Sequence, residues 1–352
     1  MAATATLATA ETGQAPARAR RGIPLLRSGK AIAGLIIFGA FVLLAVIGPW
    51  IAPEDPSKTG GPILQSPSGE HLLGTTQSGQ DILSQVLEGA RTSMLVGLVA
   101  ATFATALAIL IGVTAGYVGG WVDDTLSMLT NIFLVIPALP LTIVLTGYLE
   151  GGGWFPIAVV ISVTGWAFGA RLQRAQTLSL RNRDYIKAAK AIGERPWRIV
   201  TVELVPNLGA IIISGFLFTF IFAILTEASL SFLGLGDLGG TWSWGTTLYW
   251  AQNSSAFTTG AWWWYIPPGL CIALVGASLS LINFGADELM NPRLAPVPKR
   301  DRKRRRRTAG PVLAAATGTA GTAGAAARTD ATVPPARDDA PVSASAGKEP
   351  TP

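Results

Sequence analysis

The chain has 352 residues, of which 49% are hydrophobic and 14% are charged, and it carries a formal net charge of +6. Its single cysteine, Cys271, and single histidine, His71, exclude a disulfide framework and a cysteine or histidine metal cluster within one chain. We therefore expect no metal site here.

Six stretches contain no Asp, Glu, Lys or Arg and are long enough to cross a hydrocarbon core about 30 Å thick. They are residues 31–52, 92–118, 125–149, 154–170, 207–226 and 265–286. A soluble domain would carry amphipathic surface helices, whereas these stretches are apolar all round. The pattern predicts an all-α membrane protein with six transmembrane helices.

Basic residues predict the side of the membrane that each connection occupies, because Lys and Arg are retained in cytoplasmic loops. Residues 53–90 contain a single basic residue, Lys58, and residues 231–264 contain no Lys or Arg. The N-terminal tail, the loop 171–207 and the segment after the last stretch are rich in basic residues. Both termini and the loop 171–207 are therefore predicted to be cytoplasmic.

These features divide the chain into consecutive parts. They are a cytoplasmic basic tail (1–30), a first transmembrane helix (31–52), an extracellular or periplasmic segment (53–90), a five-helix core (91–290) that contains the loop 171–207, and a basic, then disordered, cytoplasmic tail (291–352). The last part is rich in Ala, Gly, Thr and Pro, and such a segment cannot repay the entropy of ordering. Its basic run, 299–307, is expected to contact anionic membrane lipid, and no nucleic-acid partner is expected.

Two absences limit how the chain could use energy. Gly29-Lys30 is followed by Ala31, so it does not complete the Gly-Lys-Ser/Thr ending of a phosphate-binding loop. The six stretches also lack the carboxylates and histidines that a proton relay within a membrane requires. A membrane-embedded enzyme would need a cluster of nucleophile, base or metal ligands, and no such cluster is found among the six stretches. An ion-coupled secondary carrier remains as the alternative function of a different class. Energy for any pumping is expected to come from another subunit.

The loop 171–207 has the pattern of two short amphipathic helices. Four apolar residues at helical spacing lie on one face of the first: Tyr185, Ala188, Ala189 and Ile192. Asn182 or Asp184 is expected to cap its start and Gly193 to end it.

The second helix is predicted to start at Pro196 and to be interrupted by Pro206 just before the fifth stretch. Its apolar positions are Trp197, Val200, Thr201 and Leu204. The pattern alone fits two interpretations equally well, a basic helix pair lying on lipid and a surface that docks a protein.

A resemblance distinguishes between them. The run DYIKAAKAIGERPWRIVTVELVPN, residues 184–207, resembles the EAA loop of ABC-importer permeases. Further matching runs occur in the expected order: HLLGTTQSGQDILSQVLEGARTSMLVG, GYVGGWVDD, TEASLSFLGLG and SWG. Together, over about residues 25–295, they resemble the C-type permease subunit of the dipeptide/oligopeptide/nickel importers.

This resemblance implies a type I ABC-importer permease fold in a bacterial plasma membrane. Such a subunit would form half of a translocation pathway for di- or oligopeptides, with oligosaccharides or nickel as alternatives. Its implied partners are a second homologous permease, two ATPase subunits that hold ATP and magnesium, and an extracellular solute-binding protein. This chain itself would hold no cofactor and would not be an enzyme.

The resemblance also assigns residues. It implies ATPase coupling through six residues: Tyr185, Ala188, Ala189, Ile192, Gly193 and Pro206. Lys187 stands where the family usually has Glu, and Glu203 where this subfamily often has His, which implies different charge partners on the ATPase. In the outer segment, Gln80 replaces the basic residue of a Gly-Arg-Asp pattern.

Three residues near the outer side are candidates for translocation or an outer gate: Glu227, Trp242 and Trp244. An ionisable group at a membrane span is a functional candidate by default, although capping of the following turn is the preferred interpretation of Glu227. The two tryptophans belong to a cluster between residues 242 and 264. An interfacial aromatic belt, contact with a binding protein and stacking against a sugar all remain open for this cluster.

Overall fold

The structure is a computed structural model that describes residues 29–148 and 153–290. The expected cytoplasmic tails lie outside the described residues, apart from residues 29 and 30, and so does the expected disorder after residue 307.

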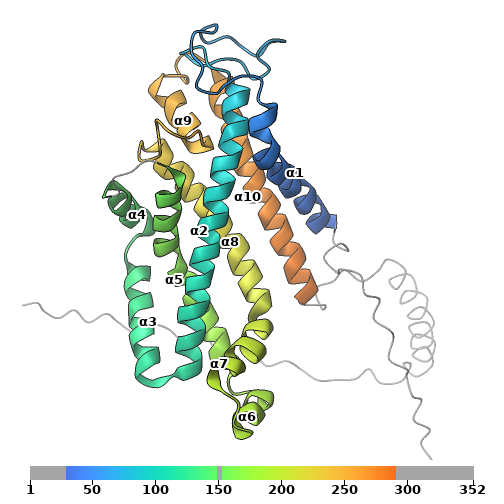
Figure 1. Cartoon of the computed structure of the whole chain (residues 1–352), viewed down its shortest axis with the longest axis vertical. Coiled ribbons are helices and arrows are strands. Elements are labelled where there is room, and N and C mark those ends of the chain that lie inside the picture. The colour runs from blue at the N-terminus through green and yellow to red at the C-terminus, as the bar shows by residue number, and fades with distance from the viewer. Residues whose placement is uncertain (1–28, 149–152, 291–352) are drawn as a thin grey trace, which may run out of the picture. The chain divides into compact units, whose positions relative to one another are not determined.

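The described ranges are helical, joined by turns and irregular segments. The elements are α1 (Gly29–Ile51), α2 (Ile82–Val118), α3 (Gly120–Val135), α4 (Ala138–Gly147), α5 (Trp154–Leu180), α6 (Asp184–Ala191), α7 (Pro196–Arg198), the π-helical turn η2 (Ile199–Leu204), α8 (Val205–Phe232), α9 (Trp244–Asn253) and α10 (Trp262–Met290). The long helices run side by side, with α9 and the segment 52–81 at one end and α6 at the other (Figure 1).

By length and composition, five helices or helix runs in the described ranges could cross a membrane, and six if α3 and α4 form one span. The count of six expected from the sequence thus depends on the α3–α4 pair. The other predicted spans correspond to α1, α2, α5, α8 and α10, although several helices are longer than their apolar stretch. α2, for example, begins at Ile82, ten residues before the apolar stretch that predicts it.

The third predicted span, 125–149, is not a single straight helix. α3 ends at Val135, α4 begins at Ala138, and the two axes differ by 88°. Pro137 stands at the break, and Ile136 before it has an extended backbone with φ −72° and ψ 125°. Because proline disfavours the helical conformation of the residue before it, the Ile136-Pro137 pair explains the break.

Close packing between α2 and α5 relies on a stripe of small residues. Every fourth residue of α2 along this stripe is Ala or Gly, and all are buried: Ala100, Ala104, Ala108, Gly112 and Gly116. A Cβ atom added to Gly112 would come within 2.3 Å of the Ala170 carbonyl oxygen on α5. Small residues permit such an approach of two backbones, which is how helices associate where lipid supplies no hydrophobic driving force.

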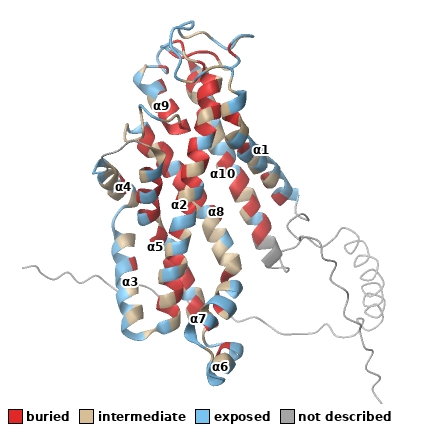
Figure 2. Ribbon diagram, in the orientation of Figure 1, coloured by how far each residue is buried: buried red, intermediate tan, exposed pale blue. Residues whose placement is uncertain are grey.

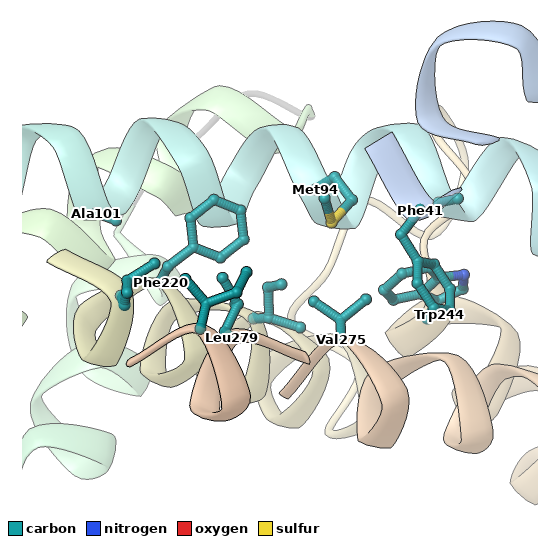
Figure 3. Close-up of a cluster of buried hydrophobic side chains, with 11 residues drawn as sticks. Phe41, Met94, Ala101, Phe220, Trp244, Val275 and Leu279 are labelled. Atoms are coloured by element: carbon teal, nitrogen blue, oxygen red, sulfur yellow. The ribbon is translucent and has the colours of Figure 1, made fainter. Parts of the chain in front are cut away.

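A second packing centre joins α1, α2, α8 and α10 near the end that carries α9 (Figure 3). Its buried members include Phe41, Met94, Phe220, Val275 and Leu279. The indole of Trp244, at the start of α9, enters this cluster and meets Phe41 edge-on, with ring centroids 5.8 Å apart. This cluster therefore fixes α9 on the transmembrane helices.

The segment between α1 and α2 is ordered by polar contacts at the start of α2. Asp81 caps α2 by accepting from the Ser84 backbone N–H over 2.8 Å, and its other oxygen lies 3.1 Å from His71 Nδ1. Gln80, which replaces the expected basic residue, accepts from Gln85 Nε2 over 3.1 Å and donates to the Ser57 carbonyl over 3.4 Å. Neutral amides therefore make the contacts at this position.

Candidate functional site

The basic loop, residues 171–207, begins as the last turns of α5 and continues through α6, α7 and η2 into α8. α6 lies at the end of the helices opposite α9 (Figure 1). The loop is therefore a helical elbow between two long helices.

The end of α6 follows the sequence prediction. Gly193 has φ +80°, its N–H donates to the Lys190 carbonyl, and the Glu194 N–H donates to the Ala189 carbonyl, both over 3.1 Å. This pair of bonds is a Schellman motif, which requires the left-handed conformation that glycine adopts without strain. Pro196 then stands in the first turn of α7, as predicted.

The predicted N-terminal cap is wrong. Arg183 occupies the cap position, and no side chain accepts a hydrogen bond from the start of α6. Asp184 instead lies in the first turn, where a carboxylate interacts favourably with the helix dipole.

Pro206 does not interrupt the second helix of the elbow. The π-helical turn η2 precedes it, and the backbone stays helical from Pro196 to Phe232. In η2 the Val205 N–H bonds five residues back, to the Val200 carbonyl, and such turns shift the hydrogen-bond register within a helix. Pro206 lies next to this shift, where the loss of its N–H is tolerated.

One residue that the sequence pattern missed anchors α6. Ile186 is fully buried in a cluster with Val113 of α2, Ile199 and Leu204 of η2, and Leu208 of α8. The apolar pattern assigned a different face, because Ile186 falls between the residues at helical spacing. A buried Ile186 holds α6 on the ends of α2 and α8.

The predicted coupling residues lie mainly on the outside of this anchored helix. Tyr185 is 40% exposed and Ile192 77% exposed, Ala188 is exposed, and Ala189 is half-buried. Trp197 of α7 is 62% exposed. Figure 2 shows exposed residues covering most of α6. The elbow therefore presents an apolar surface that no other described part of the chain covers.

Charges flank this surface. Lys190 Nζ lies 4.7 Å from the centre of the Tyr117 ring, and Arg198 pairs with Glu194. By contrast, the side chains of Arg183, Lys187 and Arg195 form no ion pair or hydrogen bond within the described ranges. An exposed apolar surface with a positive rim is the result.

A polar strap joins the elbow end of α5 to α3. Arg174 donates to Asp123 from both Nε and Nη2, the latter over 2.8 Å, and Arg171 donates to Asn131 over 3.3 Å. Arg181 reaches back to the Gly116 carbonyl of α2 over 3.1 Å. α2, α3 and α5 are thus tied together next to the elbow.

At the opposite end, the structure places Glu227 and Trp244 inside the protein. Glu227 is buried and accepts hydrogen bonds from Ser93 of α2 and Ser231 of α8. Trp244 is also buried, and its indole N–H donates to the Val86 carbonyl over 3.1 Å. Their proposed roles in translocation or gating stay predictions.

Trp242 lies nearer the surface. It lines a small pocket of about 220 Å³ with Ser57 and Gln80, and its indole donates to Ser57 Oγ over 3.0 Å. Trp263 likewise donates to the Thr75 carbonyl over 3.3 Å, and Trp264 is buried. Much of the tryptophan cluster therefore serves to pack and tie the outer segments.

The α3–α4 break forms one wall of a cavity of about 420 Å³. Its other walls are α5 and α8, which contribute small and aromatic residues such as Gly165, Phe168, Gly215 and Phe222. This cavity was not predicted, because the third span was expected to be one continuous helix without a break at Pro137. A membrane protein with a cavity between discontinuous helices has the means to hold a solute.

Comparison with known proteins finds two family matches in this chain. Residues 108–296 match the family described as the inner membrane component of binding-protein-dependent transport systems, and residues 24–67 match the N-terminal transmembrane domain of oligopeptide transport permease C.

Among its relatives, the dipeptide transport system permease protein DppC of Alkalihalophilus pseudofirmus is 34% identical over 277 residues, which cover 78% of this chain and 90% of the relative. The oligopeptide transport system permease protein OppC of Bacillus subtilis is 33% identical over 274 residues, which cover 76% of this chain and 87% of the relative. A chain of the MetNI methionine ABC transporter, solved in inward-facing conformations, is similar with a TM-score of 0.47 and 18% identity, covering 59% of this chain and 95% of that chain.

Proposed function

Because the chain belongs to the family of binding-protein-dependent transport system inner membrane components, we propose that it is a permease subunit that forms half of the pathway of an ATP-driven peptide importer. The family makes it a multi-pass permease of the bacterial inner membrane. In the proposed assembly, two ATPase subunits bind ATP and magnesium, a second permease completes the pathway, and an extracellular protein delivers the solute.

The observation that carries the ATPase coupling is the contrast between two isoleucines of the elbow. Ile186 is fully buried, whereas Ile192, six residues later, is 77% exposed. The buried residue fixes α6 to the helices, and the exposed one adds to an apolar surface available to a partner. A helix held in this way can transmit a push from a partner protein.

Length argues against the alternative in which the elbow lies flat on lipid. The helical run Pro196–Phe232 has 37 residues, which at about 1.5 Å each is about 55 Å. A hydrocarbon core takes up about 30 Å of this length, whereas an interfacial helix sits only about 5–10 Å into the headgroup boundary. The charge-free stretch of this run is 207–226, so residues 196–206 add about 16 Å on the α6 side of it. This end therefore extends beyond the hydrocarbon, into the cytoplasm in the proposed orientation.

The proposed mechanism is alternating access by rigid-body movement. ATP binding closes the two ATPases, which draws the elbows of the two permeases together. Since the backbone is helical from Pro196 to Phe232, movement of the elbow passes along α8 to the region around Glu227. The Asp123–Arg174 strap makes α3 and α5 follow the same movement. ATP hydrolysis and release reverse it.

The cavity at the α3–α4 break is the proposed section of the translocation pathway in this chain. It lies between α3, α4, α5 and α8, with Ser214, Thr164 and Thr219 as its hydroxyl groups. Peptides are the proposed solute because the relatives named above are dipeptide and oligopeptide permeases. Oligosaccharides and nickel are the alternatives within the same importer class.

The test is uptake by the full assembly in proteoliposomes. Ala188→Trp, on the exposed side of α6, is expected to abolish ATP-dependent peptide uptake while the chain remains in the membrane. Ile36→Trp on the exposed side of α1 is the matched control and should leave uptake unchanged. Normal uptake by Ala188→Trp would contradict the coupling. Uptake by the chain alone under an ion gradient would identify a secondary carrier, and competition by oligosaccharide or nickel would identify the alternative solutes.

A further inference from the structure

An apolar groove of about 450 Å³ runs along the wall of the protein between α1 and α2. Val42, Val46 and Trp50 contribute to it from α1, and Met94 and Leu98 from α2. Every residue that lines it is apolar except Arg91. The groove lies on helices that are long and apolar enough to cross a membrane, so its surroundings include lipid chains.

Arg91 lies at the outer end of this groove. It is the tenth residue of α2, which begins at Ile82, and it lines the groove together with Trp50, next to the last residue of α1. Trp50 is 81% exposed. Exposed tryptophans are typical of the boundary between hydrocarbon and headgroups, and an arginine near a helix end can extend its charge to this boundary, so the groove enters the hydrocarbon from there.

The guanidinium of Arg91 has no partner in the part of the chain that the structure describes. It is exposed and forms neither an ion pair nor a hydrogen bond there. Glu88, one turn earlier on α2, is half-buried and does not pair with it. A cation at the edge of hydrocarbon is costly unless an anion or water meets it, so the position favours an anionic group.

We propose that this groove binds one phospholipid of the leaflet nearest α9, with an acyl chain along α1 and α2 and the phosphate on Arg91. A guanidinium presents paired N–H donors that match two phosphate oxygens, which makes the contact both charged and directional. The apolar lining gains little over bulk lipid by itself, because lipid chains are as apolar as the groove. Retention of the lipid therefore depends on Arg91, whereas its placement depends on the groove.

This proposal stands independently of ATPase coupling, because α1 and Arg91 lie away from the elbow. A second permease chain is the competing occupant. It would need to bring an acidic group to Arg91 and apolar side chains into the groove, and it would exclude the lipid.

The test uses the full chain, purified with its co-purifying subunits in nanodiscs that contain a phosphatidylglycerol with a photoactivatable group in its acyl chain. We expect the label on α1 and α2 peptides that border the groove. Arg91→Gln should lower this labelling about tenfold, the size expected for loss of a charged hydrogen bond. Lys58→Gln, which removes a cation from the same outer side but outside the groove, should not lower it.

A second pair of variants tests the groove itself. Val46→Trp fills it, whereas Leu43→Trp places the same side chain on an exposed position of α1 outside it. Only the former should lower the labelling. A labelled diacylglycerol, which lacks the phosphate, should label the groove of the unchanged chain no more than it labels the rest of the wall. Equal labelling of Arg91→Gln and the unchanged chain would overturn the proposal, as would a cross-link from Val46→Cys to a second permease in place of lipid.

Discussion

Ser93 of α2 donates its hydroxyl hydrogen to Glu227 Oε2 of α8 over 3.1 Å, and the same Ser93 oxygen accepts the backbone N–H of Trp244 over 3.2 Å. Ser231 donates to the other carboxylate oxygen over 2.9 Å. α2, α8 and the start of α9 therefore meet at one buried carboxylate. Glu227 acts here as a structural tie between helices, deeper in the protein than a cap at its surface.

This tie predicts coupled effects on stability. Glu227→Ala leaves Ser93 and Ser231 without their acceptor, which should lower the free energy of unfolding by roughly 2 kcal/mol. Ser93→Ala should also lower the free energy of unfolding. The loss in the double variant should be smaller than the sum of the two single losses, by about 0.5–3 kcal/mol. Denaturant unfolding in detergent measures all three. Ser229→Ala is the control and should have little effect, because the Ser229 hydroxyl bonds only within its own helix, to the Leu225 carbonyl. Additive effects would show that Ser93 and Glu227 do not act together.

The elbow predicts a separation of stability from transport. Ile186→Ala removes a fully buried side chain and should lower the free energy of unfolding by about 2–5 kcal/mol, with loss of uptake. Ile192→Ala removes a side chain that is exposed, so unfolding should change by no more than about 0.5 kcal/mol. Uptake by Ile192→Ala should nevertheless fall if the exposed surface docks a partner. If both uptake and stability are unchanged, Ile192 is not part of the docking surface.

The glycine that ends α6 predicts a graded series. Gly193 has φ +80° and open space where a Cβ would stand, so a side chain there meets backbone strain and no clash. Gly193→Ala should cost about 1–2 kcal/mol, and Gly193→Asn should cost less because asparagine tolerates the left-handed conformation. ATP-dependent uptake should fall in the same order. If both variants behave alike, the Schellman turn is not what holds the elbow in position.

Replacement by alanine is expected to have opposite effects on stability at two glycines, one in the small-residue stripe of α2 and one on α8. Gly112→Ala would push a methyl group into the Ala170 carbonyl and should cost about 1–3 kcal/mol. Gly209 lies in α8, and a Cβ atom added there would have no neighbouring atom within 4 Å. Gly209→Ala should therefore be neutral or stabilise the protein by up to about 1 kcal/mol. Thermal unfolding of the two variants in the same detergent compares them directly. Destabilisation by both would indicate that α8 is also covered, by a surface outside this chain.

Most of the transmembrane fold was predictable from the sequence because a span is encoded locally, by length and by the absence of charge. The ends of the elbow were predictable for a similar reason: Gly193 and Pro196 determine the backbone at their own positions. The break in the third span could also have been found, since Pro137 lies in the middle of the stretch 125–149. The run of apolar residues on both sides of Pro137 concealed it.

What the sequence did not predict depends on contacts between distant segments. Ile186 lies off the apolar stripe of α6, and only the ends of α2 and α8 determine that it is the buried residue. Ser93, which donates to Glu227, lies 134 residues away in the chain, and the Trp244 backbone N–H that bonds the same Ser93 oxygen lies at the start of α9. The continuity of the helix through Pro206 depends on η2, and no residue type signals a π-helical turn. Tertiary packing decided each of these features.

The strap between α3 and α5 predicts partial rescue by exchange of charge. Asp123→Asn leaves Arg174 without its bidentate partner and should lower the free energy of unfolding by about 1 kcal/mol, since the pair is partly exposed. Asp123→Arg with Arg174→Asp restores an ion pair but places a cation in the first turn of α3, where the helix dipole opposes it. The double variant should therefore be more stable than Asp123→Arg alone and less stable than the unchanged chain. Uptake should follow the same order if α3 moves with the elbow through this strap. Uptake that stays normal while stability falls would separate the strap from the movement that drives transport.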